Sequence, residues 1–499
     1  MTQASDVIVG TESGKLRGRL RGGIGTFLGI PFAAPPVGAL RFRAPQPVPG
    51  WAGIRDALEY GPTAPQPARD STLVPEPTSD GDAYLNLNID TPGQMGDRLP
   101  VLVWIHGGGF FAGCNRSPWF RGDRFARDGV VVVSVSYRLG AEGFMPIPGA
   151  PPNRGVLDWI AALQWVRRNI AAFGGDPDNV TIAGQSAGAA ACTYLLMIPR
   201  ARGLFRRVIA MSGSIGFGLT QARAEEIGRD LSRTLGVAYD IAALAGCDPT
   251  RFIAAQADLT GPDASARRAP LSAVERFAHG LPFQPVIDGE IIVQSSADAV
   301  QAGVGSDIPV LLSATAEEFD FVTRGGEPAT AEAELAGALA LLGLTGETAD
   351  AYRDLHRTLS PDALLGRAIT DRMFRARAVQ MAEARSAAPA ATYLAEFRWK
   401  PQPPVADGLG ACHCLDIPFA FDLLDAPQVD RIAGPNPPQA LASRLHQAWV
   451  GFARSGEPGW PAYRAEGRHA MLLDAVAEAG SDPFAAERAI WAASSWAGG

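Results

Sequence analysis

Apolar and polar positions along the 499-residue chain alternate between strand-like and helix-like segments. The runs 101–105 and 130–135 are short, apolar and rich in β-branched residues, as strands buried on both faces are. Residues 156–173 instead carry apolar side chains at helical spacing, with Arg167 and Arg168 opposite, which predicts an amphipathic helix. The same reasoning predicts further strands at 180–183, 208–211 and 310–312, and helices at 187–197 and 441–454.

This alternation of strands and helices is typical of an α/β protein whose large, mostly parallel sheet is covered by helices. No low-complexity linker or internal repeat divides the chain, so we expect a single domain over residues 1–499. The Ala/Leu-rich stretch 329–390 is predicted to be helical and to form a cap-like insertion over the core.

Composition narrows the function classes. The net charge is -8 without a basic block, which argues against nucleic-acid partners. No run of 18 apolar residues is present, so no membrane-spanning helix is expected, and the first residues do not resemble a signal peptide. We expect a monomer or small homo-oligomer that acts on a small molecule.

A five-residue motif, Gly184-Gln185-Ser186-Ala187-Gly188, lies between a predicted strand and a predicted helix. It fits the G-x-S-x-G turn, in which a strained strand-to-helix turn exposes a nucleophilic serine. The glycines are required because a Cβ at either position would collide with neighbouring backbone. An ordinary tight turn is the alternative, but the strand-turn-helix setting favours a nucleophile at Ser186.

A second glycine-rich segment, His106-Gly107-Gly108-Gly109-Phe110, follows the strand 101–105. Consecutive glycines mark backbone that must approach another group closely. The spacing from Ser186 predicts an oxyanion hole made by the N–H groups of Gly108, Gly109 and Ala187. We expect His106 to hold the loop rather than to titrate.

Several further segments resemble the type-B carboxylesterase and cholinesterase family, and among its members the bacterial para-nitrobenzyl-esterase-like ones. They span nearly the whole chain: 27–42, 137–144, 169–188, 449–453, and Trp460 with Pro461 and Tyr463. The resemblance implies the α/β-hydrolase fold and a serine carboxylesterase that forms an acyl-enzyme intermediate.

The resemblance also completes a catalytic triad. Five histidines follow Ser186, namely His279, His356, His413, His446 and His469, and pattern alone does not choose among them. The family's histidine precedes an acidic residue and an aromatic-proline run, which matches His413. The family's acid matches Glu318, with Glu317 as the competing candidate, because Phe319 stands where a glycine normally follows the acid.

The cysteines do not suggest a disulfide framework or a metal site. Cys412 and Cys414 flank His413, but their spacing is wrong for a zinc pair, so we expect small buried thiols. Ester hydrolysis by this triad needs no metal and no organic cofactor. Ala64 and Tyr84 replace the family's secreted-type cysteine pair, which implies an intracellular, cytoplasmic bacterial enzyme.

The resemblance also indicates what the substrate is not. No tryptophan lies between residues 61 and 86, where cholinesterases carry their choline-binding indole. Gln185 replaces the carboxylate that many relatives carry before the serine. A quaternary ammonium needs an aromatic face and negative surroundings, so we expect small, largely uncharged esters. Phe110, Phe111, Gln185 and Leu281 are candidate pocket residues.

Two ion pairs are implied by the same resemblance. Arg138 and Asp158 should meet near the centre of the fold, and Arg41 is expected to pair with Asp82, which is shorter than the family's glutamate.

Two other functions remain open. One is a non-catalytic, adhesion-type relative that keeps the fold for binding. The other is a lactonase, amidase, carbamate hydrolase or acyltransferase that uses the same triad, because a triad determines the chemistry at a carbonyl and leaves the substrate to the pocket.

Overall fold

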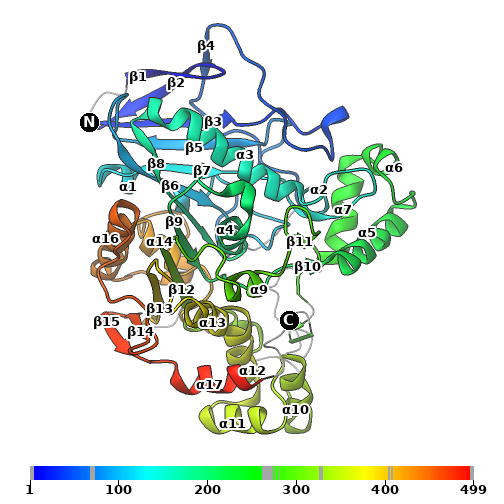
Figure 1. Cartoon of the computed structure of the whole chain (residues 1–499), viewed down its shortest axis with the longest axis vertical. Coiled ribbons are helices and arrows are strands. Elements are labelled where there is room, and N and C mark those ends of the chain that lie inside the picture. The colour runs from blue at the N-terminus through cyan, green and yellow to red at the C-terminus, as the bar shows by residue number, and fades with distance from the viewer. Residues whose placement is uncertain are drawn as a thin grey trace.

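A long sheet runs through the molecule in the computed structural model, which describes residues 5–67, 73–260, 274–275, 277–278, 280–324, 330–402, 405 and 408–494. Across these residues the sheet has 13 strands in the order β1-β2-β3-β5-β7-β6-β8-β9-β12-β13-β14-β15, with β4 paired to β2. The strands are β1 Ser5–Thr11, β2 Gly14–Arg21, β3 Ile24–Pro31, β4 Ile54–Asp56, β5 Asn86–Thr91, β6 Leu99–Ile105, β7 Val131–Val135, β8 Gly175–Gln185, β9 Arg207–Met211, β12 Val310–Thr315, β13 Thr392–Phe397, β14 His469–Leu473 and β15 Glu478–Ser481. Figure 1 shows the first strands at the top and the last at the lower left.

The central strands pair in parallel, from β7 through β6, β8, β9, β12 and β13 to β14. Antiparallel pairs occur at both ends of the sheet, among β1, β2, β3, β5 and β7 and between β14 and β15. Strand β6 shows why the centre is apolar throughout. Val103 and Ile105 pack into the core on one face, and Leu102 and Trp104 into the core on the other. Each predicted strand is present within a few residues of its expected bounds, so the predicted α/β fold with a mostly parallel sheet is confirmed.

Helices cover both faces of the sheet (Figure 1). They are α1 Asp123–Arg127, α2 Gly140–Phe144, α3 Arg154–Asn169, α4 Ala187–Met197, α5 Gln221–Leu235, α6 Ile241–Ala245, α7 Pro249–Thr260, α9 Ser296–Gln301, α14 Asp416–Ala420, α15 Asp430–Ala433, α16 Gln439–Ser455 and α17 Ala485–Ala493, with a small sheet of β10 Leu219–Thr220 and β11 Val286–Ile287. Helix α3 packs against β8, and α4 packs against β8 and β9. No helix among the described residues is long and apolar enough to cross a bilayer.

The stretch expected to form a helical insertion is helical from residue 332 onward, while residue 329 lies outside the described residues. It contains α10 Glu332–Leu341, α11 Glu347–Leu355, α12 Pro361–Thr370, the π-helical turn η6 Asp371–Arg375 and α13 Ala376–Ala384. These helices lie below the sheet in Figure 1, and α13 packs against β12 and β13. The turn η6 interrupts a helix that otherwise runs from α12 into α13.

A buried ion pair joins the loop that follows β7 to helix α3. The Nε and Nη2 atoms of Arg138 donate to the two carboxylate oxygens of Asp158 at 2.8 and 2.6 Å. The Arg138 side chain is 1% exposed and that of Asp158 is 0% exposed, so neither charge has water as an alternative partner. The pair expected from the family resemblance is therefore present.

The prediction that Arg41 pairs with Asp82 was wrong. Arg41 pairs with Glu142 of α2, with 2.9 Å between Nε and Oε1, and the hydroxyl of Tyr84 donates to the other oxygen of Glu142. Asp82 lies exposed in the loop before β5. The reason is burial: the buried guanidinium of Arg41 pairs with the carboxylate of Glu142, which is desolvated with it, whereas Asp82 stays hydrated.

Arg138→Met tests the buried pair. Removing one partner leaves Asp158 buried and uncompensated, so the free energy of unfolding should fall by about 3–5 kcal/mol. Urea unfolding followed by circular dichroism measures the change. Arg223→Ala, which breaks an exposed pair with Glu226 on α5, is the matched control and should stay within about 0.5 kcal/mol of the wild type. If both variants lowered the free energy of unfolding by the same small amount, the stabilising role assigned to the Arg138–Asp158 pair would be contradicted.

Candidate active site

The expected nucleophile stands at the junction of β8 and α4. Ser186 has φ 57° and ψ -123°, a conformation that a non-glycine residue adopts only under strain. A Cβ on Gly188 would lie 2.0 Å from the carbonyl oxygen of Ile105, and one on Gly184 would lie 2.4 Å from the backbone of Gly188. The two flanking glycines are therefore required by close backbone approach, as the motif predicts.

The glycine loop after β6 reaches the same place, because neighbouring parallel strands end at the same edge of the sheet. Gly108 has φ 102°, and a Cβ there would lie 2.1 Å from the carbonyl oxygen of Ala112. Within the described residues, the N–H groups of Gly108 and Gly109 donate to no protein acceptor. Ala187 is the first residue of α4, so its N–H has no acceptor inside the helix. Gly107, Gly108, Gly109 and Ser186 line one cavity.

His106 holds this loop, as expected. Its Nδ1 donates to the carbonyl oxygen of Gly107 at 2.9 Å, and its ring stacks on Tyr137 with 4.5 Å between centroids. The hydroxyl of Tyr137 donates to the carbonyl of His106. Burial lowers the pKa of His106 to about 4, so the imidazole is neutral at physiological pH.

His413 lines the same cavity as Ser186 and contacts Glu318. The Nδ1 atom of His413 is 2.6 Å from Oε2 of Glu318, and both side chains are buried. The other oxygen of Glu318 accepts from the backbone N–H of Thr315 at 2.8 Å. The rings of Phe319 and Phe374 pack on the imidazole, with centroids 4.6 and 5.0 Å away. The glutamate is thereby held so that it can orient one tautomer of the histidine.

The neighbouring carboxylate points elsewhere. Glu317 accepts from Lys400 at 2.8 Å and from Arg324 at 2.9 Å. Burial by itself would raise the pKa of Glu317, but the hydrogen bond from Lys400 and the charges of Arg324 and Lys400 lower it overall. Of the two candidates, the histidine contacts Glu318.

The other downstream histidines that the structure describes do not line the cavity of Ser186. His446 is buried in α16 and bonds the carbonyl of Ala420 and the carboxylate of Asp128. His356 packs on Tyr352 after α11. His279 lies outside the described residues. Neither His356, His446 nor His469 lines the cavity that contains Ser186.

The imidazole has one further neighbour. Nε2 of His413 lies 3.1 Å from Nε2 of Gln185. Within the described residues, no hydrogen bond joins the side chains of Ser186 and His413. Both residues nevertheless line the same cavity.

That cavity has a volume of about 160 Å³ and a wall rich in phenylalanine. Phe111, Gln185 and Leu281 line it, as expected. Most of its wall was not foreseen, and comes from residues scattered over the chain: Leu73, Val74, Glu76, Phe120, Phe217, Phe277, Gly280, Phe319, Phe321, Met373, Phe374 and Cys414. No spacing or motif marks these side chains in the sequence, except that Phe319 and Phe321 follow Glu318 closely.

The expectation for Phe110 was wrong. Its side chain is 0% exposed, does not line the cavity and packs on Phe144 and Trp159 in the core. Consecutive residues of this loop point in opposite directions, and the left-handed backbone of Phe110, with φ 65°, turns its ring inward. Phe111, the next residue, lines the cavity instead.

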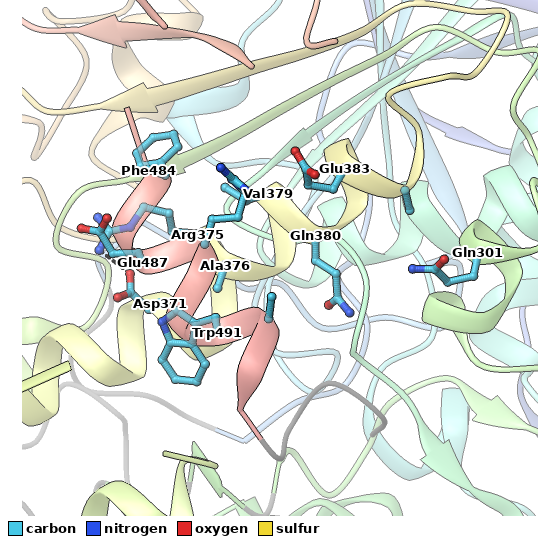
Figure 2. A pocket seen from close by; sticks show the side chains of 13 residues that line it. Gln301, Asp371, Arg375, Ala376, Val379, Gln380, Glu383, Phe484, Glu487 and Trp491 are labelled. Carbon is cyan, nitrogen blue, oxygen red and sulfur yellow. Dashed lines mark hydrogen bonds and ion pairs between the residues drawn. The ribbon is translucent and has the colours of Figure 1, made fainter. Parts of the chain in front are cut away.

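A second cavity of about 340 Å³ lies between α13 and α17 (Figure 2). The turn η6 separates it from the first: Asp371 and Arg375 line the second cavity, whereas Met373 and Phe374 line the cavity with Ser186. Arg375 is buried and pairs with Asp371 and Glu396, the latter at 2.8 Å. These ion pairs hold the π-helical turn that presents Phe374 to His413.

The cysteines beside His413 are free and buried, and their pKa values are raised by burial, so both thiols stay protonated. Among the described residues, no three His, Cys, Asp or Glu side chains are arranged to hold a metal ion.

The chain is similar to known esterases and to a related hydrolase. Residues 5–479 match the carboxylesterase family. A para-nitrobenzyl esterase of Bacillus subtilis is 34% identical over 501 residues, which cover 96% of this chain and 97% of the relative. A phenmedipham hydrolase of Pseudarthrobacter oxydans is 34% identical over 505 residues, covering 95% and 97%. The crystal structure of the Geobacillus stearothermophilus carboxylesterase EST55 at pH 6.8 has a TM-score of 0.83 and 34% identity, and covers 97% of this chain and 99% of that one.

Fold and site together define an α/β-hydrolase. The chain belongs to the carboxylesterase family and is a carboxylic ester hydrolase.

Two neighbouring phenylalanines give a test of the cavity wall. Phe110→Ala opens a void in the core and should lower the free energy of unfolding by about 3–5 kcal/mol. Phe111→Ala should cost less stability and raise KM for an apolar ester about tenfold, because it removes a cavity contact. Urea unfolding and steady-state kinetics measure both variants. The assignment is wrong if Phe110→Ala changes KM while Phe111→Ala only destabilises.

Proposed function

We propose that the chain hydrolyses esters through Ser186 as nucleophile, His413 as general base and Glu318 as the acid that orients the histidine. The contact of 2.6 Å between Glu318 and His413, which lines the same cavity as Ser186, carries this proposal. Glu318 keeps the proton of the neutral imidazole on Nδ1, so Nε2 has a lone pair for the serine proton.

The chemistry follows from these positions. His413 takes the proton of Ser186 as the oxygen attacks the ester carbonyl, and then gives it to the leaving alcohol. The N–H groups of Gly108, Gly109 and Ala187 stabilise the oxyanion, each lowering the barrier by roughly 3 kcal/mol. Water then attacks the acyl-enzyme by the same route. Glu318 stabilises the imidazolium without accepting its proton.

The substrates we propose are uncharged esters with an aromatic group. Seven phenylalanines line the cavity, namely Phe111, Phe120, Phe217, Phe277, Phe319, Phe321 and Phe374. Aromatic walls favour aromatic guests by offset stacking and edge-to-face contact. The relative named para-nitrobenzyl esterase carries such a group in its name. The phenmedipham hydrolase favours a second candidate, a carbamate hydrolase with the same triad.

We also infer that the enzyme is bacterial and acts in the cytoplasm. Its five cysteines are all free thiols, as is usual in a reducing compartment. The two similar relatives named above are bacterial proteins.

Ser186→Ala tests the nucleophile. Hydrolysis of p-nitrophenyl acetate should fall by about 10⁴-fold or more, because only oxyanion stabilisation and binding remain. Intact mass after treatment with a fluorophosphonate should show one adduct on the wild type, mapped to Ser186, and none on the variant. A wild type that neither turns over nor labels would instead support a non-catalytic binding protein.

Glu318→Gln and Glu317→Gln form a matched pair. Glu318→Gln should lower kcat by about 10³- to 10⁴-fold because it no longer fixes the histidine tautomer. Glu317→Gln should leave kcat within about threefold and instead weaken the contacts with Lys400 and Arg324. Steady-state kinetics at constant pH compares them, and the reverse order would make Glu317 the acid.

A further inference from the structure

Gln185 ends strand β8 and directly precedes Ser186. Its side chain is buried and lines the cavity. Its amide nitrogen lies 3.1 Å from Nε2 of His413. The residue therefore contacts the one imidazole atom that ester hydrolysis requires.

The direction of this hydrogen bond follows from the rest of the ring. Nδ1 faces the Glu318 carboxylate at 2.6 Å, and a carboxylate only accepts, so Nδ1 carries the proton. Nε2 of the neutral ring is then an acceptor, and the amide N–H of Gln185 donates to it. The Nε2 lone pair of His413, which must take the serine proton, therefore already accepts a hydrogen bond from Gln185.

We propose that Gln185 is a positioning residue that holds the neutral imidazole of His413 in a resting arrangement, and that Ser186 engages Nε2 only after the Gln185 amide gives up its bond. This inference rests on the proposed function. Because the amide also lines the cavity, a bound ester can displace it. The hydrogen bond from the amide N–H to Nε2 forms only with the neutral ring, because an imidazolium carries a proton on Nε2.

Few other charges reach the imidazole. The titratable groups around it are Glu318, Asp416 on α14, Cys412, Cys414, Ser186 and, on the cavity wall, Glu76. Burial and the charge of Glu318 raise the pKa of Asp416 well above its ordinary value, so this carboxyl is neutral. The two thiols are neutral as well. A carboxylate at position 185 would thus add a second negative charge within hydrogen-bond distance of the imidazole, beside that of Glu318.

Two variants separate the two halves of the proposal. Gln185→Glu keeps the shape but replaces the donor by a carboxylate, which favours the imidazolium, so the acid limb of kcat/KM should move up by about one pH unit or more. Gln185→Leu removes the competing donor, so fluorophosphonate labelling of Ser186 at neutral pH should become about fivefold faster, as expected for the loss of one neutral hydrogen bond. Gln301→Glu, on the wall of the second cavity, controls for the added charge and should leave both readouts unchanged.

The Nδ1 proton of His413 gives a readout that does not require turnover. Its low-field ¹H NMR resonance, followed over pH in the Ser186→Ala background, should titrate at higher pH with Gln185→Glu than with Gln185. The proposal would be overturned if Gln185→Glu moved neither the acid limb of kcat/KM nor the titration of this resonance. Unchanged labelling of Ser186 in Gln185→Leu would also overturn it. Failure of the wild type to label would count against the proposed function instead.

Discussion

The carbonyl of Ile105, at the end of β6, lies against the first turn of α4 with no room for a side chain between them. Gly188 is required there because its missing Cβ lets α4 start directly beside β6. This contact brings the glycine loop after β6 and the turn after β8 to one point. The strained backbone of Ser186 follows from it, and so do the N–H groups of Gly108 and Gly109, which have no acceptor within the described part of the chain. Without this close approach the chain would have two separate loops and no site.

Two adjacent glutamates lie in different electrostatic surroundings. Glu317 and Glu318 follow the same strand, yet one faces Lys400 and Arg324 and the other faces His413. In the turn after β12 the two side chains face different partners, and of the two only Glu318 contacts the histidine. Glu317 is paired with the cations Lys400 and Arg324.

The cavity is built by segments that the fold, and not the chain order, brings together. Phe217 follows β9, Phe319 and Phe321 follow β12, and Phe374 comes from the turn η6. The same turn is anchored on its far side by Arg375, which pairs with Asp371 (Figure 2) and with Glu396. A π-helical turn places Phe374 and Arg375 on different sides, so one short element both shapes the pocket and buries its anchor.

The sequence by itself determined the local chemistry. The glycines around Ser186 and after His106 are needed because of backbone clashes, and short apolar runs rich in β-branched residues favour strands buried on both faces. The α/β class, the proposed nucleophile and the proposed oxyanion loop were therefore predictable from residue types and spacing. His413 and Glu318 followed from resemblance to a family, since no spacing rule links residues so far apart. Only the tertiary structure decided the rest: that Glu142 and not Asp82 reaches Arg41, that Phe110 turns into the core, and that Gln185 contacts His413. Each depends on which side chains share a desolvated space, and long-range packing determines that.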